Sequence, residues 1–225
     1  MQNLQWALQL LGKLKTILGY NGTNQITVAT AKFGDASNYS QFEADGTLKA
    51  VGNATVWEDI NIPIINLRGG ATAPGFKVLA STGIYVSTFD GTGASVISAH
   101  GSMEILHSYK EGSDIVPHIH WSPTTVDAGN VRWQLEYVWI AKNGTISAST
   151  TIGVTVAVSG VANQIVRTDL GTISGVGMAM SSRFIFRLFR DPVDVLDTYA
   201  HDVNGFDFGV HFEKDTIGSR QIDTK

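Results

Sequence analysis

Within residues 131–141, large apolar side chains recur at every second position, and this period of two limits the fold more than any other feature. The apolar positions are Trp133, Leu135, Tyr137 and Trp139, and the polar ones are Arg132, Gln134 and Glu136. Because successive side chains of a β-strand point to opposite faces, the pattern predicts a strand with one face in a core. Asn143-Gly144 follows and favours a type I′ turn, so we predict a hairpin whose second strand spans residues 145–158.

Similar alternation and similar turns recur along most of the chain. Residues 183–190 and 206–213 alternate in the same way, and Asn-Gly or Asp-Gly pairs occur at positions 21, 45, 90, 143 and 204. Further strands are predicted at 26–31, 48–51, 54–60, 83–90, 96–105 and 116–122. No helical pattern separates these strands, which excludes a βαβ architecture. We predict an all-β fold, an antiparallel β-sandwich of jelly-roll type with a short N-terminal α-helix.

The first twenty residues differ from the rest of the chain. A heptad-like stripe is formed by Leu4, Ala7, Leu11, Leu14 and Leu18. This 3-4 spacing predicts a helix that ends near Gly19, and so short a helix needs a partner to be stable. We expect residues 1–20 to be an anchor or oligomerisation segment and residues 21–225 to be the β-sandwich domain. The helix could instead pack on its own domain.

Composition excludes several classes of protein. Charged residues make up 16% of the chain and the formal net charge is -4, with no basic block, so we expect no nucleic-acid partner. No apolar run approaches the ~18 residues that span a bilayer, so we expect no membrane partner. Cysteine is absent, which removes thiol nucleophiles and cysteine-based zinc sites. The low charge suits a repetitive assembly better than a freely diffusing enzyme.

His118 and His120 form the only closely spaced histidine pair. Residues i and i+2 of a strand share a face, so both imidazoles point away from the face of Ile119 and Trp121. If Trp121 lies in the core, the pair faces outward. Three identical chains could then place six ring nitrogens around one divalent metal on a threefold axis, and we expect no other cofactor. The alternative, which the residues favour over a metal, is that both are ordinary hydrogen-bonded histidines on a half-polar strand.

Two alternative functions can be stated from the same residues. A cupin-like metal enzyme would use His118 and His120 with a third ligand from His100, His107 or His211. The carboxylate expected three or four residues after the pair is missing, however, because Pro123 and Thr124 stand there. A carbohydrate-binding module would use Trp57 or Trp121 as a stacking platform.

A charged loop precedes the histidine strand. Tyr109, Lys110, Glu111 and Asp114 could form the rim of a ligand site, or only the solvated end of the sandwich. No Gly-x-Ser-x-Gly nucleophile motif occurs in the chain. We therefore name no catalytic residue and expect a protein that is not an enzyme.

Three segments resemble small β-rich virion proteins of tailed bacteriophages and prophages. They are residues 54–64 (ATVWEDINIPI), 109–125 (YKEGSDIVPHIHWSPTT) and 212–225 (FEKDTIGSRQIDTK). The resemblance implies a structural component of the virion, a fibre, decoration or tail protein that forms a homotrimer. Its partners would be other virion proteins (capsid, portal or tail) and, where it contributes to attachment, a host-surface glycan.

Overall fold

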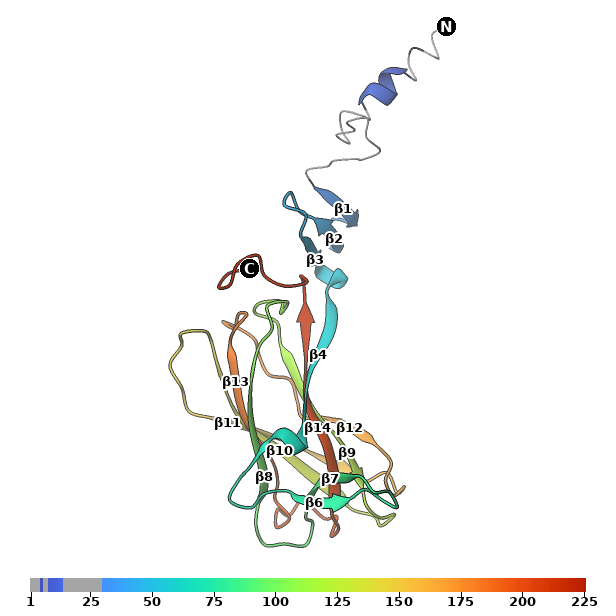
Figure 1. The fold of residues 1–225 in the computed structure, drawn as a ribbon, viewed down its shortest axis with the longest axis vertical. Coiled ribbons are helices and arrows are strands. Elements are labelled where there is room, and N and C mark those ends of the chain that lie inside the picture. The colour runs from blue at the N-terminus through green and yellow to red at the C-terminus, as the bar shows by residue number, and fades with distance from the viewer. Residues whose placement is uncertain (1–4, 6–7, 14–29) are drawn as a thin grey trace. The chain divides into compact units, whose positions relative to one another are not determined.

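A computed structural model of the chain describes residues 5, 8–13 and 30–225, which divide into two compact units. One unit comprises residues 1–56 with 215–217, and the other comprises residues 57–214 with 218–225. Residues 5 and 8–13 are helical (Figure 1). Leu11 is the one member of the predicted stripe among the described residues, and it is exposed. Leu4, Ala7, Leu14, Leu18 and the predicted boundary at residue 20 lie outside them.

The first unit contains a small antiparallel sheet of three strands. These are β1 (Ala31–Gly34), β2 (Tyr39–Phe42) and β3 (Leu48–Val51), in that order. The Asp35 carboxylate caps the β1–β2 turn because it accepts hydrogen bonds of 2.7 Å from the backbone N–H groups of Ser37 and Asn38. Strand 48–51 was predicted correctly, whereas β2 was not predicted. Residues 26–29 of another predicted strand lie outside the described residues.

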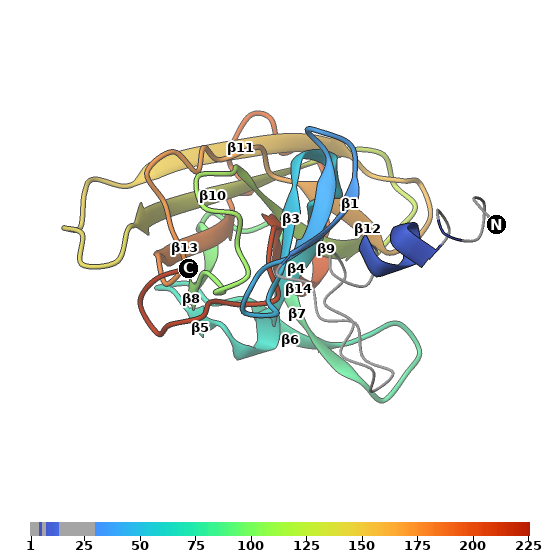
Figure 2. The same ribbon diagram turned by 90° about the horizontal axis from the view of Figure 1, so that it is seen from above.

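The second unit is a sandwich of two antiparallel sheets. The five-stranded sheet has the order β11 (Thr150–Ala157), β10 (Asn130–Ile140), β13 (Arg183–Arg190), β8 (Ile97–Glu104) and β5 (Arg68–Gly69), and most of it forms one layer in Figure 2. The six-stranded sheet has the order β12 (Val166–Asp169), β9 (Ile115–Pro123), β14 (Val203–Lys214), β7 (Tyr85–Phe89) and β6 (Gly75–Val78), with β4 (Val56–Pro63) also paired to β14. Short 3-10 turns occupy Gly52–Ala54 and Ile64–Asn66. The predicted fold class is confirmed.

Aromatic side chains from the two sheets meet in the core. The ring centroids of Trp121 on β9 and Trp133 on β10 are 6.0 Å apart. Phe208 of β14 stacks on Phe186 of β13 with ring centroids 4.1 Å apart. All four side chains are buried. Burial of aromatic side chains of this size contributes strongly to stability, because each removes a large apolar area from water. The predicted inward positions of β10 and β13 are therefore the ones that hold the sheets together.

The β10–β11 hairpin forms as predicted, but its turn differs. Leu135 pairs with Ile152, whereas the return strand begins at Thr150 instead of residue 145. The turn closes by a 2.8 Å hydrogen bond from Gly144 N–H to the Ala141 carbonyl, and Asn143 alone has a positive φ, of 62°. A type I′ turn needs positive φ at both central residues, so that prediction was wrong. Residues 145–149 of the return segment are exposed, so pairing them with β10 would bury little apolar surface and add little stability.

No helix among the described residues is both long and apolar enough to cross a membrane.

Candidate functional site on the outer face of the larger sheet

Strand β9 places its two histidines on the face that points away from the core. Ile119 and Trp121 are fully buried between the sheets, whereas His118 and His120 project from the opposite face. The prediction that the pair faces away from Trp121 is confirmed. Trp121 itself donates a 2.8 Å hydrogen bond from Nε1 to Thr168 Oγ1 and has no exposed surface. It cannot be a stacking platform for a carbohydrate, so that expectation was wrong.

His118 is fully buried even though it lies on the outer face. Its cross-strand neighbour is Gly209 of β14, and a Cβ atom there would lie 2.4 Å from His118 Cε1 and 2.4 Å from Asn61 Oδ1. The imidazole therefore lies across the bare backbone of Gly209. The ring of His211 stacks on it with centroids 4.2 Å apart. A metal on a threefold axis would need His118 at the surface, and its burial within its own chain contradicts that arrangement.

Two carboxylates face these rings, and together the five side chains form what we call the outer-face cluster. Its members are Asp59, His118, His120, Asp207 and His211. Asp59 Oδ2 lies 3.4 Å from His118 Nε2 and 3.7 Å from His211 Nδ1, whereas Asp207 Oδ1 makes a direct 2.6 Å contact with His120 Nδ1. Neither aspartate was singled out from the sequence as a partner of the histidines. Both could have been found from the alternation of side chains along a strand, because Asp59 and Asp207 occupy positions whose side chains point away from the core.

The environment of His118 favours its neutral form. Burial lowers the pKa of His118 from its usual 6.5, and the neighbouring His211 and His120 lower it further. Asp59 opposes this shift because a carboxylate favours the charged imidazolium, and a weaker contact with the Val116 backbone acts in the same direction. Since burial is the largest effect, the His118 ring is neutral at neutral pH and offers a free nitrogen lone pair.

Of the three other histidines considered as ligands, His211 alone lies beside His118. His100 is on β8 in the other sheet, where its Nε2 lies 3.3 Å from Ser98 Oγ. His107 lies between two serine hydroxyls, at 2.6 Å from Ser219 Oγ and 3.1 Å from Ser181 Oγ. These three histidines could not be distinguished from the sequence, because only strand pairing decides which of them lies next to β9.

A shallow groove runs beside the cluster, and Trp57 lies where its two parts meet. One part, of about 310 Å³, is lined by Trp57, Val116, Arg167, Asp169 and His211. The other, of about 660 Å³, is lined by Trp57, Lys110, Glu111, Gly112, Ser113, Asp114, Val116, Thr172 and Glu213. We call the two parts together the Trp57 groove. The Trp57 side chain is 58% exposed.

The predicted rim loop lines this groove with three of its four named residues. Lys110, Glu111 and Asp114 lie along it, and Lys110 forms an ion pair with Glu213. Tyr109 does not belong to the rim, because its side chain is fully buried and its hydroxyl donates to the Ser113 carbonyl. That burial raises the pKa of Tyr109 to about 12. Tyr109 therefore supports the loop from beneath.

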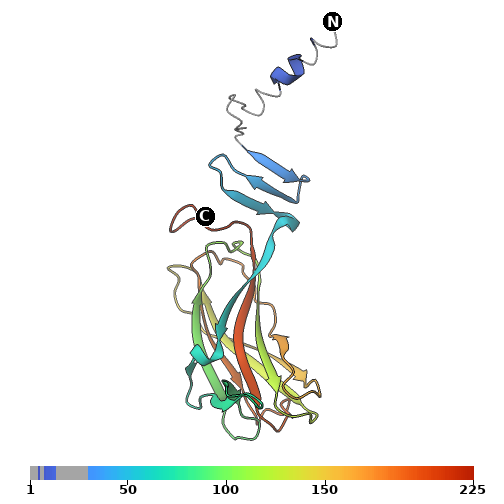
Figure 3. The same cartoon turned by 45° about the vertical axis from the view of Figure 1, so that its right-hand side comes forward.

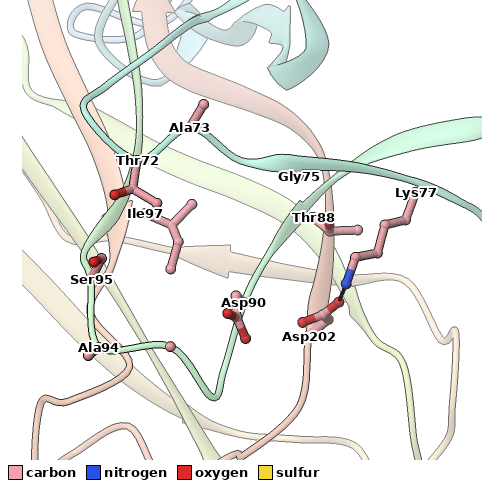
Figure 4. A pocket seen from close by; sticks show the side chains of 11 residues that line it. Thr72, Ala73, Gly75, Lys77, Thr88, Asp90, Ala94, Ser95, Ile97 and Asp202 are labelled. Atoms are coloured by element: carbon pink, nitrogen blue, oxygen red, sulfur yellow. Dashed lines mark hydrogen bonds and ion pairs between the residues drawn. The ribbon is translucent and has the colours of Figure 1, made fainter.

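Another cavity, of about 370 Å³, lies where β6, β7 and the start of β8 come together (Figure 4). Lys77 and Asp202 form an ion pair at its edge, and Asp90 accepts hydrogen bonds from the N–H and the hydroxyl of Thr92. Its remaining lining consists mainly of small side chains, among them Ala73, Ala94 and Ser95. The charged groups of this cavity are therefore already paired within the chain.

Parts of residues 54–64, 109–125 and 212–225, the segments on which the predicted resemblance is based, lie side by side in the structure. Residues 54–64 contain β4, residues 109–125 contain β9, and residues 212–225 begin with the end of β14. Because β14 pairs with both β9 and β4, these distant segments form neighbouring strands of one sheet (Figure 3). Asp59, His118 and His120 come from them, and His211 immediately precedes the third.

Comparisons with known proteins give likenesses in fold. No model of a known protein family matches the sequence, and no curated protein matches it. Similar solved structures include an Arthrobacter globiformis T6 isomalto-dextranase, with a TM-score of 0.44 and 11% identity over 68% of this chain and 23% of that one. A family 35 carbohydrate-binding module from Clostridium thermocellum gives 0.39 and 9%, covering 69% of this chain and 98% of that one.

Viral proteins also occur among the similar structures. The tailspike protein 4 of bacteriophage CBA120 has a TM-score of 0.33 and 10% identity, covering 72% of this chain and 19% of that one. This chain therefore spans less than a quarter of the isomalto-dextranase and of the tailspike chain. Other carbohydrate-binding modules and glycoside hydrolases also occur among the similar structures.

Proposed function

We propose that this chain is a structural protein of a tailed-bacteriophage virion that binds a host-surface carbohydrate in the Trp57 groove. The observation that carries the proposal is Trp57 itself, a large aromatic side chain that is 58% exposed at the junction of two shallow hollows. An exposed indole with polar groups on both sides suits a sugar ring, which has an apolar face and a rim of hydroxyl groups.

The position of the groove supports the virion part of the proposal. Trp57 lies in the first of the three segments that resemble phage virion proteins, and the loop at residues 110–114 lies in the second. The groove is therefore built partly from the segments that carry the resemblance, with Arg167, Asp169, Thr172 and His211 contributed from outside them. We expect capsid, portal or tail proteins as partners and the virion as the location.

The carboxylates of the groove favour binding over catalysis. Glu213 pairs with Lys110, Asp169 pairs with Arg167, and Asp114 accepts a 3.1 Å hydrogen bond from the backbone N–H of Gly175. Each of these acidic groups is already engaged within the chain. Such contacts hold the walls of a binding surface in place.

Binding of the full-length protein to a panel of purified bacterial surface polysaccharides tests the role of the groove. We expect Trp57→Ala to weaken binding to the preferred polysaccharide by at least tenfold, because the stacking surface is lost. Phe76→Ala is the matched control, since Phe76 is a similarly exposed aromatic residue (57%) on β6, outside the groove. Equal binding by the Trp57 variant and the unaltered protein would contradict the proposal, as would a lack of binding to any polysaccharide.

Mass spectrometry of purified particles tests the virion role separately. We expect peptides of this chain in particles of the phage or prophage that encodes it, at a fixed ratio to the capsid protein. Their absence from particles that contain the other structural proteins would reject the virion role and leave the carbohydrate role to be judged on binding alone.

A further inference from the structure

We propose that Asp59, His118 and His211 bind one Zn²⁺-type ion within each chain and so join three strands of the larger sheet. The three residues lie on β4, β9 and β14, which are neighbours in the sheet although 152 positions separate Asp59 from His211. This site shares His211 with the wall of the Trp57 groove, but it does not depend on the proposed function.

The spacing of the donor atoms fits a shared ion better than direct hydrogen bonds. Asp59 Oδ2 lies 3.4 Å from His118 Nε2 and 3.7 Å from His211 Nδ1. Both distances are beyond the usual hydrogen-bond range of 2.7–3.2 Å. Ligand atoms at 2.0–2.1 Å from a tetrahedral zinc ion are about 3.3 Å apart, which the 3.4 Å distance between Asp59 and His118 matches. The His211 ring stacks on His118 with an interplanar angle of 17°, and the lone pairs of parallel imidazoles do not converge, so His211 must turn out of the stack to bind the same ion. The 2.6 Å contact of His120 with Asp207 is instead a direct hydrogen bond, so this pair is not part of the metal site.

Buried polar atoms without partners point to a missing ligand. Within residues 30–225, His118 Nε2 is fully buried and has no hydrogen-bond partner, and Asp59 Oδ1 is also buried without one. Leaving such buried groups unsatisfied destabilises the folded state. An ion bound by His118 and Asp59 would remove part of that destabilisation.

The donor set selects the kind of metal. Two imidazoles and one carboxylate are typical of Zn²⁺ and of similar transition ions, whereas Ca²⁺ takes six to eight oxygen ligands. Asn61 donates a 2.9 Å hydrogen bond from Nδ2 to Asp59 Oδ2, which orients the carboxylate. His211 also lines the smaller part of the Trp57 groove, through which an ion could reach the site from solvent.

Arg167 opposes metal binding in the arrangement observed. Its Nη1 lies 3.4 Å from His211 Nε2. If His211 binds a metal through Nδ1, its ring proton must be on Nε2. The Nε2–H group and the Arg167 N–H group would then be two donors that face each other. Arg167 also pairs with Asp169, and its side chain is half-exposed, so it can turn away from His211. We therefore expect Arg167→Gln to bind the metal as tightly as the unaltered protein or more tightly.

Titration of the full chain, first stripped of metal with a chelator, tests the site directly. We expect calorimetry with Zn²⁺ to give one ion per chain, and Co²⁺ to produce the visible absorption bands of a four-coordinate site with nitrogen and oxygen ligands. Zn²⁺ should also raise the melting temperature, because it binds the folded state. Asp59→Asn and His211→Gln should each weaken Zn²⁺ binding at least a hundredfold. Because His211 is partly exposed, its substitution should disturb the fold little, so a loss of Zn²⁺ binding in this variant reports on the metal site.

Two histidine variants serve as controls. His120→Gln alters the neighbour that pairs with Asp207, and His201→Gln alters a surface histidine paired with Asp127. Both should retain the zinc affinity within about threefold. The proposal is overturned if Zn²⁺ does not bind, if one ion binds per three chains, or if the affinity falls equally in the His211 and His201 variants.

Discussion

At the scale of single residues, the most unusual side chain is the guanidinium of Arg190, which is buried completely in the sandwich. It forms a bidentate pair with Asp197, with Nε and Nη2 each 2.8 Å from a carboxylate oxygen. Its other N–H groups donate to the backbone carbonyls of Phe89, His201 and Tyr199. All five N–H groups are thus used. The charge is tolerated because no donor is left without an acceptor.

Loss of the Arg190 charge should therefore be costly. We expect Arg190→Met to lower the free energy of unfolding by about 3–5 kcal/mol, because the Asp197 carboxylate would remain buried without its partner. Urea denaturation of the full chain measures this. Arg183→Met on the same strand is the control, since Arg183 is exposed and its pair with Glu104 is 3.5 Å long, and it should change stability by less than about 0.5 kcal/mol. Similar losses in both variants would contradict this account.

At the scale of elements, a β-bulge determines which residues of β14 reach the outer face. The pairing with β9 shifts between Gly205 and Asp207, so Phe206 is an extra residue without a partner in the β9 register. Beyond the bulge, Asp207, Gly209 and His211 face outward, and Phe208, Val210 and Phe212 face the core. Bulges redirect side chains in this way at many functional sites. The predicted alternation of 206–213 holds from residue 207 onward.

The small sheet β1–β3 should open more readily than the sandwich. None of its residues is buried, whereas β9 has seven buried residues of nine. A three-stranded sheet with so little buried surface has few contacts that must break before its amides exchange. We expect hydrogen exchange by mass spectrometry to give protection factors at least about tenfold lower in β1–β3 than in β9 and β14. Equal protection in the two sets of strands would show that the small sheet is stabilised by contacts outside it.

At the scale of the whole molecule, the homotrimer is still a prediction. We expect light scattering on the purified chain to give a mass three times that of the 24.2 kDa protomer. A chain that lacks residues 1–20 should still have three times the mass of its own shorter protomer, because the β domain is expected to carry the self-assembly while the helix attaches to other virion proteins. A mass of one protomer for the full chain would contradict the trimer. If the full chain is a trimer but the truncated chain is a monomer, residues 1–20 and not the β domain carry the assembly.

Much of the fold could be predicted from local patterns. Strands at 48–51 and 183–190 were predicted with their observed bounds, and the histidine pair was assigned to the correct face of β9. These successes depend on strand parity, which the sequence displays directly. Strands β2, β5, β6 and β12 were not predicted, because each has at most four residues and too few alternations to form a pattern. Arg190 lies two positions after Leu188 and four after Phe186, so its side chain is on the same inward face. This spacing could have revealed its burial.

The sequence by itself determined which side chains share a face of each strand, because side-chain direction follows from backbone geometry within a few residues. It could not determine which strands lie next to one another, since that depends on how the two sheets pack and where each chain reversal returns. Only the tertiary structure placed β4 beside β14, and with it Asp59 beside His118 and His211. The candidate metal site exists because residues far apart in the sequence project from neighbouring strands onto the same face.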